Sequence, residues 1–354
     1  MKILDRYLGR TVAGAAAMVM LFLLTAFSFF GFLDELNDVG RGSYSVLAAA
    51  EFTLLRVPVI AYQLFPVAAL IGTLLGLGTL VGNSEMVVIR AAGVSLARTI
   101  VAVMKAGLVL TVIAILVGEF LAPTAEQDAT NLRSLALSNQ IALKTRNGFW
   151  ARDGNSFINI RSILPGDRVE NIYIYEFDSK DRLRVSTHAK SAHYADKQWL
   201  LNNIEQTIFT SDAVTVRRIN HAVWKSLLRP ELIGLVIINP DSLSTWELVN
   251  YIHYLRQNSQ NTQRYEQALW SKLVYPLATA AMVFLAIPMV FASARVASVG
   301  GRIMIGSLVG IVFHIVNQAA GHLGVVLNLN PVISVVTPTL LVIVAGFILL
   351  RRVT

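Results

Sequence analysis

Six long stretches of the chain are apolar and almost free of charge, and they constrain the fold more than any other feature. A membrane-spanning helix needs about 20 apolar residues to cross a hydrocarbon core of about 30 Å. The stretches cover residues 11–33, 57–82, 99–121, 273–294, 303–327 and 332–350, and only the third contains charges, Lys105 and Glu119 near its ends. The sequence therefore predicts a polytopic α-helical membrane protein with six transmembrane helices.

Composition supports a membrane rather than a soluble class. Hydrophobic residues make up 55% of the chain and charged residues 15%, whereas soluble domains average about 25% charged. The net charge of +8 comes without a cluster of four basic residues, so we assign it to membrane flanks rather than to nucleic-acid binding. Cysteine is absent, which excludes disulfides and Cys-ligated metals.

Basic flanks predict how the chain is oriented. A signal-peptide core has about 7 to 15 residues, and the first apolar stretch is longer than this, so we expect it to remain as a membrane anchor. Cytoplasmic flanks are enriched in Lys and Arg. We therefore expect both termini in the cytoplasm and residues 123–266 outside, because the basic residues at alternate flanks all fall on one side: Lys2, Arg6, Arg10, Arg90, Arg98, Arg295, Arg302, Arg351 and Arg352.

The outer insert changes periodicity along its length. Residues 124–144 are polar and predict a helix, whereas residues 183–191 alternate apolar and polar positions, as a strand with one wetted face requires. A β-sandwich or an open β-roll fits this pattern. Ser244 and Glu247 then form a capping-box pattern that predicts a helix to about Gln257. The expected domains are residues 1–122 with a cytoplasmic helix at 83–95, residues 123–266, and residues 267–354.

Catalytic signatures are missing. The chain has no Gly-Lys dipeptide and hence no phosphate-binding loop, and it lacks HExxH and GxSxG. The centres of the apolar stretches lack the carboxylates that proton-coupled carriers usually need. We expect a protein that is not an enzyme and has no cofactor of its own.

The link between the second and third stretches predicts a short surface helix. Met86, Val87, Ile89 and Arg90 lie on it, and Glu85 in its first turn faces the positive end of the helix dipole. A partner protein could grip such a helix. An ordinary amphipathic turn lying on lipid headgroups fits the periodicity as well.

Small residues recur at the spacing that lets helices pack closely. The pairs are Gly72 with Gly76, Gly78 with Gly82, and Gly306 with Gly310. Close helix contacts are the usual consequence of such pairs.

Two clusters are candidates for a substrate path. His314, Asn317, Gln318 and His322 fall largely on one helix face, which suits either a cavity or hydrogen bonds between helices. Their spacing is too loose for a metal site, and we assign none. The phenylalanines around Phe27 and Phe30 suit an acyl-chain pocket or an aromatic interface belt.

Several sequence blocks, in order, resemble one known family across the full chain. They are LDRYLGRT, GRGSY, FPVAALIGTLLGLGTL, SEMVVIRAAG, FWARDGNSFINI and RYEQALWSKLVYPL. The chain resembles the LptF/LptG permeases of lipopolysaccharide export, with the closer likeness to the LptG branch.

The resemblance implies a function and a set of partners. Such a permease subunit extracts lipopolysaccharide from the outer leaflet of the Gram-negative inner membrane, and its β-domain is a periplasmic jellyroll. The implied partners are the paralogous permease LptF, the cytoplasmic ATPase dimer LptB that binds ATP and Mg, the single-helix partner LptC and the periplasmic bridge protein LptA. The alternative is a membrane-anchored periplasmic scaffold or binding protein without a translocation cavity.

The resemblance also implies site residues. Glu85, Met86, Val87, Ile89, Arg90 and Gly93 would form the helix that couples to the ATPase. The lipid cavity would be lined by Phe27, Phe30, Asp34, Leu64, His314 and Asn317. Relatives often carry lysines near the outer end of the first helix, where this chain has Gly31, Asn37 and Asp38. Arg41 and Arg56 could bind substrate phosphates instead, because guanidinium groups bind phosphate oxygens bidentately; the second subunit could equally supply the charge.

Overall fold

The computed structural model describes residues 2–138, 143–164, 168–178, 180, 182–195, 198–210, 213–224, 240–258, 260–292 and 299–352. Arg295, which entered the orientation argument, lies outside the described residues. The chain divides into two compact units. A helical unit comprises residues 1–37, 50–129 and 263–354, and a β unit comprises residues 38–49 and 130–262.

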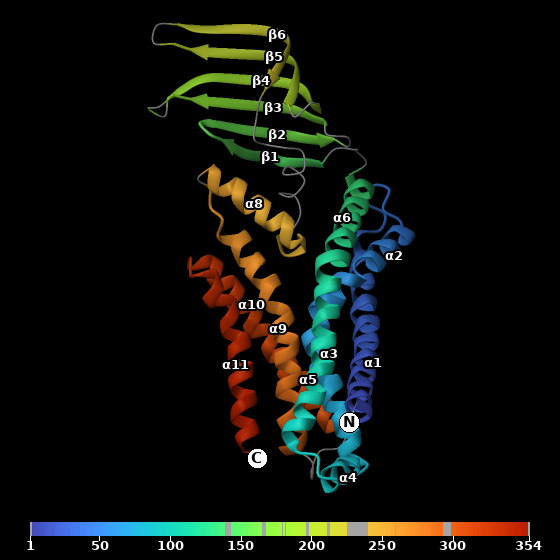
Figure 1. Ribbon diagram of the computed structural model, residues 1–354. Coiled ribbons are helices and arrows are strands. Elements are labelled where there is room, and N and C mark those ends of the chain that lie inside the picture. The colour runs from blue at the N-terminus through green and yellow to red at the C-terminus, as the bar shows by residue number, and fades with distance from the viewer. Residues whose placement is uncertain are drawn as a thin grey trace. The chain divides into compact units, whose positions relative to one another are not determined.

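Six helices of the helical unit are long and apolar enough to cross a membrane, which confirms the predicted fold class. They are α1 (Lys2–Glu35), α3 (Val57–Gly82), α5 (Leu96–Leu116), α9 (Gln263–Ala292), α10 (Val299–Val326) and α11 (Pro331–Arg351). Figure 1 shows both chain ends at the same end of this bundle as the short helix α4 (Glu85–Ala91). This placement agrees with the basic flanks on which the predicted orientation rests.

Shorter helical segments connect the long helices. The 3-10 turn η1 (Leu36–Asp38) and helix α2 (Val46–Leu55) follow α1. The π-turn η2 (Val117–Leu121) joins α5 to α6 (Ala122–Ser138). The prediction of a helix over residues 124–144 was too long, because strand β1 already begins at Leu143.

Glycines let α3 lie at the centre of the bundle. A Cβ atom on Gly72 would come within 2.3 Å of the Ala16 Cα atom of α1, and one on Gly76 within 3.1 Å of the Val12 Cα atom. On α10, a Cβ atom on Gly306 or Gly310 would approach α3 side chains to 2.8 Å. The predicted close contacts are confirmed for these two pairs. In the third pair only Gly78 makes a close contact, because it accommodates the buried side chain of Arg302. A Cβ atom on Gly82 would meet nothing within 4 Å.

Six antiparallel strands form one sheet in the β unit, with each strand paired to the next. Their bounds are β1 (Leu143–Asp153), β2 (Ser156–Leu164), β3 (Arg168–Phe177), β4 (Leu183–Ala195), β5 (Gln198–Phe209) and β6 (Val214–Trp224). One face is buried, including Ile158, Ile160, Ile172 and Ile174, as the predicted alternation requires. An antiparallel β-domain inserted between the helices is thus confirmed, and its described strands form an open meander.

The buried face changes parity partway along the strands. On β3 the buried positions change from Val169 to Ile172, and the intervening Asn171 has φ 52°. On β5 they change from Leu201 to Ile204, and Asn203 has φ 51°. Asparagine tolerates the left-handed conformation better than most residues. At Asn171 and Asn203 this conformation shifts the alternation by one residue, so the buried side chains before and after each asparagine lie on the same face of the sheet.

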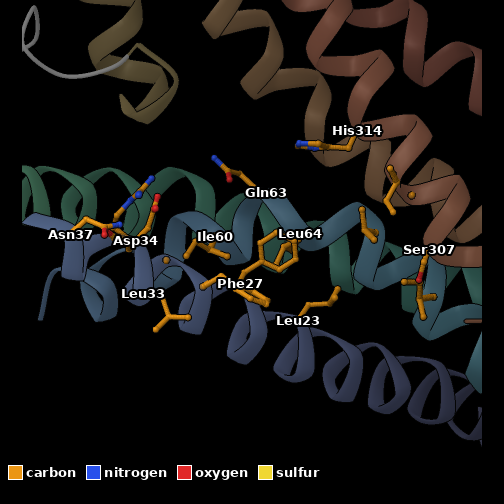
Figure 2. A pocket seen from close by; sticks show the side chains of 17 residues that line it. Leu23, Phe27, Leu33, Asp34, Asn37, Ile60, Gln63, Leu64, Ser307 and His314 are labelled. Carbon is orange, nitrogen blue, oxygen red and sulfur yellow. The ribbon is translucent and has the colours of Figure 1, made fainter. Parts of the chain in front are cut away.

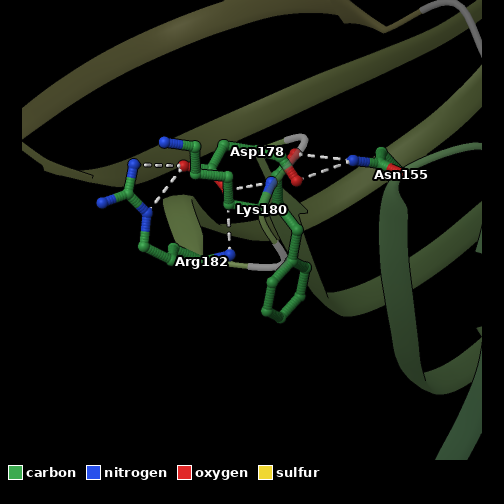
Figure 3. A network of polar contacts seen from close by, with 5 residues as sticks. Asn155, Asp178, Lys180 and Arg182 are labelled. Carbon is green, nitrogen blue, oxygen red and sulfur yellow. Dashed lines mark hydrogen bonds and ion pairs between the residues drawn. The ribbon is translucent and has the colours of Figure 1, made fainter.

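The turn between β3 and β4 is organised by one carboxylate (Figure 3). Asp178 accepts backbone N–H groups of Lys180 and Arg182 at 2.8 and 3.0 Å, and the Arg182 guanidinium lies 2.9 Å from its other oxygen. These donors favour the charged form, so they lower the pKa of Asp178. Asn155 in the β1–β2 turn donates to the carbonyls of Phe177 and Asp178, which ties the two turns together.

Helix α8 (Thr245–Gln257) begins with the predicted capping box, in which Ser244 and Glu247 satisfy each other's backbone N–H groups. Its Tyr254 hydroxyl donates to the carbonyl of Arg152 at 3.1 Å, and Asn258 beyond its end accepts the N–H of Gly154 at 3.0 Å. Burial raises the pKa of Tyr254 to about 12. These bonds hold α8 against the β1–β2 hairpin.

Candidate functional site

A cavity of about 900 Å³ lies between α1, α3 and α10 (Figure 2). Helix α1 contributes Leu23, Phe27, Phe30 and Asp34, whose spacings of four, three and four place them on one helix face. Most of the lining is aliphatic or aromatic, and much of it comes from this face and from α3. The cavity can therefore take an apolar chain along the helices.

Polar groups gather at one end of the cavity, where Figure 2 places Asn37 and Asp34, and Gln63 lies nearby. Arg56 also lines it and is the cation among the lining residues. Its Nε atom lies 3.3 Å from Glu126 Oε2, and its guanidinium lies 5.5 Å from the centre of the Phe52 ring. The site combines an apolar slot with a charged end, which matches an amphipathic ligand.

Most residues that we predicted for a lipid cavity meet here. Phe27, Phe30, Asp34, Leu64 and His314 all line the cavity, whereas Asn317 does not. Three residues along a helix rotate a side chain by about 60° relative to the starting position. His314 and Ser307 are thus the polar residues of α10 that line the cavity.

Several lining residues, among them Ile60, Val67 and Ile71, were not predicted as cavity residues. Ile60, Leu64, Val67 and Ile71 line the cavity from α3 at spacings of four, three and four. That spacing marks a helix face, but α3 is apolar on every side. Of the two arginines considered for phosphate binding, Arg56 lines the cavity, whereas Arg41 does not and pairs with Asp38.

The predicted link helix forms as α4, and its faces differ. Met86 is buried in the core of the bundle, and Ile89 packs against that core. Val87 and Val88 are exposed to 65% and 67%. Val88, which we did not single out from the sequence, is therefore part of the available surface, whereas Met86 anchors the helix.

Polar contacts fix α4 at both ends. The Tyr7 hydroxyl donates to Glu85 at 2.5 Å, and the Asn83 side chain donates to the same carboxylate at 3.2 Å. Arg90 lies 5.2 Å from the centre of the Phe291 ring of α9. Gly93 follows with φ 85°, a conformation that glycine adopts without strain. Helix α4 is thereby tied to α1 and α9.

Among the residues that the structure describes, no group of three or more His, Cys, Asp or Glu side chains could hold a metal ion. His314 and His322 are eight positions apart on α10, and of the two only His314 borders the cavity.

Comparison with known proteins gives consistent matches over the whole chain. Residues 6–352 match the family model described as lipopolysaccharide export system permease LptF/LptG. A Haemophilus influenzae protein named lipopolysaccharide export system permease protein LptG is 34% identical over 351 residues, covering 99% of this chain and 98% of that protein. The Escherichia coli K12 protein of the same name is 35% identical over 340 residues, covering 95% and 94%.

Proposed function

The chain belongs to the LptF/LptG family of lipopolysaccharide export permeases, and from this premise we propose that its cavity receives lipopolysaccharide from the outer leaflet of the inner membrane. The chain is then a transport subunit and not itself an enzyme. The LptG branch is the one named by both relatives.

The observation that supports this proposal most is the cavity itself. Its apolar slot, lined by side chains such as Phe27, Phe30 and Leu64, suits acyl chains, and its polar end suits a headgroup. Extraction of acyl chains from a bilayer costs about 0.8 kcal/mol per CH₂ group. A lipid with several chains therefore needs an external energy source, and a scaffold would need no such cavity.

Helix α4 is the proposed point of contact with an ATPase. Val87, Val88 and Arg90 form its exposed surface, while Met86 and Ile89 hold it to the bundle. Glu85 and Gly93 set its ends. A displacement of this surface by the ATPase is transmitted to α1 through the Tyr7–Glu85 hydrogen bond and to α9 through the contact of Arg90 with Phe291.

The proposed assembly follows the family. The paralogous permease LptF completes the membrane dimer, the LptB dimer binds ATP and Mg on the cytoplasmic side, and LptC and LptA receive lipid in the periplasm. Both termini and α4 lie on the cytoplasmic side in this arrangement, and the β-domain lies in the periplasm.

Arg56 is the proposed contact for a phosphate of the substrate. It lines the polar end of the cavity and pairs with Glu126. A phosphate would compete with Glu126 for the guanidinium, because both offer two oxygens to its planar fork. Glu126 would then tune how strongly the lipid is held.

Site-specific photocrosslinking in cells tests the proposal. Probes replace Phe30 and His314, which line the cavity, and Phe22 and Ile315, which are exposed on the same two helices at 72% and 58% but do not line it. We expect lipopolysaccharide to be captured at the first pair and to decline there when the ATPase is active. Equal capture at both pairs would mean that the lipid touches the bundle surface without entering the cavity.

A further inference from the structure

The face of the sheet opposite the buried isoleucines carries a row of polar and aromatic side chains. The row crosses all six described strands, because each member is directly paired with the next. We call the face that carries it the outer face. The row consists of Trp150, Asn159, Tyr173, His188, Glu205 and Arg218.

Rings on the outer face stack against one another. Tyr173 and His188 have ring centres 4.5 Å apart with planes 18° from parallel. Trp150 and Tyr175 have ring centres 6.0 Å apart with planes 19° from parallel. Trp150 is 55% exposed, so a large part of its indole surface is open. Such stacking fixes the rings and leaves them partly exposed.

Arginines accompany the rings. The Arg161 guanidinium lies 4.9 Å from the centre of the Tyr173 ring, and the Arg152 guanidinium lies 5.3 Å from the centre of the Phe157 ring. Arg161 is exposed, and among the described residues no carboxylate pairs with it. The strands carry nine Lys and Arg against four Asp and Glu. The sheet as a whole is therefore basic, and Arg152 and Arg161 place part of this charge on the outer face, where it attracts anions.

From these contacts we propose that the outer face binds an acidic saccharide, meaning a sugar that bears phosphate or carboxylate groups. The C–H groups of a sugar ring pack on indole and phenol surfaces, and its hydroxyls bond to the polar groups between them. Guanidinium groups held over rings remain available to bind phosphate or carboxylate bidentately.

The inference rests on the proposed function, in which the exported lipid carries a saccharide. An apolar chain would leave the arginines without partners, which makes it a poor match for this face. Single-stranded nucleic acid uses the same combination of rings and cations, so it serves as a competing probe.

The test uses the full chain in lipid nanodiscs and a soluble probe, the phosphorylated saccharide that alkaline deacylation releases from lipopolysaccharide. Binding is measured by saturation-transfer NMR titration, with thermal unfolding to confirm folding. We expect Trp150→Ala and Arg161→Ala each to weaken binding about tenfold, which corresponds to about 1.4 kcal/mol, and Trp150→Phe to restore part of it. Phosphatase treatment of the probe should weaken binding to the wild type and abolish the effect of Arg161→Ala.

Matched controls come from the same unit. Trp246→Ala removes an indole that is 71% exposed on α8, and Arg217→Ala removes an exposed arginine that alternation places on the opposite face of the sheet. Both should leave binding unchanged. Equal loss in variants and controls, no loss in either variant, no binding by the wild type, or equal binding of a ten-residue oligothymidylate would each overturn the proposal. Lipid capture at Phe30 reports on the cavity separately, so failure of the outer face and failure of the proposed export function give different results.

Discussion

Two helices that border the cavity, α1 and α10, differ sharply from α3 and α9, which form the centre of the bundle. In their most apolar stretches, 72% of residues are buried in α3 and 67% in α9, against 11% in α1 and 17% in α10. The cavity therefore has one wall on the fixed centre and two on peripheral helices. Because few of their residues are buried within the chain, α1 and α10 can shift relative to α3 at lower cost.

Contacts between the peripheral helices, α1 and α10, and the central helix α3 limit how α1 and α10 can move. Glycines at residues 72, 76, 306 and 310 let α1 and α10 approach the α3 backbone or side chains closely. Small residues at a contact let helices approach closely, and we expect α1 and α10 to shift along these contacts. Helix α4 is tied to the peripheral helix α1 by the Tyr7–Glu85 hydrogen bond and to the central helix α9 by the contact of Arg90 with Phe291, so movement of α4 bears on both sets of helices.

The largest expected effect comes from blocking the close approach of α1 to the centre. Gly72→Ala places a methyl group 2.3 Å from the Ala16 Cα atom, and overpacking of this kind costs about 1 to 3 kcal/mol. Gly14→Ala is the control, because its Cβ atom meets nothing within 4 Å and Ala favours a helix by about 0.5 to 1 kcal/mol. We expect a lower Tm in detergent for Gly72→Ala alone. Equal Tm values would mean that the contact is not tight.

A charge on the exposed surface of α4 should separate the bundle from its ATPase. Val88→Asp changes a side chain that is 67% exposed and leaves the anchoring Met86 in place. We expect at least tenfold less co-purified ATPase, which corresponds to about 1.4 kcal/mol, with an unchanged Tm. Val326→Asp, at the last residue of α10 and 75% exposed, is the control. Normal co-purification with Val88→Asp would exclude this surface as the contact.

Changes at the polar end of the cavity should alter lipid capture without altering the bundle. Arg56→Ala removes the lining cation, and we expect lipopolysaccharide crosslinked at Phe30 to fall about tenfold or more, since a charged hydrogen bond contributes about 1.5 kcal/mol or somewhat more and about 1.4 kcal/mol corresponds to tenfold. Glu126→Gln should increase capture. Arg41→Ala is the matched control, because Arg41 pairs with Asp38 and does not line the cavity. A similar loss with Arg41→Ala would point to general surface charge.

The smallest expected effect lies in the β-domain, which should respond independently of the helices. The lowered pKa of Asp178 means that its turn contributes stability above the ordinary Asp pKa of about 3.9, and that this contribution is lost as pH falls through the folded-state value. Asp178→Asn should therefore lower the Tm of the β-domain slightly at pH 6. The difference from the wild type should shrink as pH falls below the ordinary Asp pKa and vanish below the folded-state pKa of Asp178, and lipid capture at Phe30 should not change. A difference that persists at the lower pH would contradict this account of the turn.

Elements that depend on local pattern could be predicted from the sequence. Apolar stretches of spanning length, five of them free of charge, identified the six long helices of the described residues, and the capping box at Ser244 and Glu247 formed as expected. The helix predicted to reach Lys144 ended at Ser138 instead. Polar composition alone does not separate the end of a helix from the start of a strand, because tertiary pairing with β2 decides it.

Features that depend on helix rotation could not be predicted with equal accuracy. Asn317 shares a polar stripe with His314, yet only His314 lines the cavity. Met86 and Val88 are both apolar members of one short helix, and packing against the bundle buries the first while exposing the second. In an apolar helix every face is compatible with lipid, so only the neighbouring helices determine which face is covered.

The most direct test of the central claim measures whether the peripheral helices move while the centre stays fixed. The chain has no cysteine, so spin labels can be placed in pairs and their distances measured by pulsed electron resonance in the assembled transporter. One pair joins Phe29 on α1 to Ile315 on α10, both 58% exposed, and the other joins Thr79 on α3 to Leu277 on α9. We expect ATP binding to shift the first distance and to leave the second unchanged. A first distance that stays fixed through the ATP cycle, or a shift confined to the second, would contradict it.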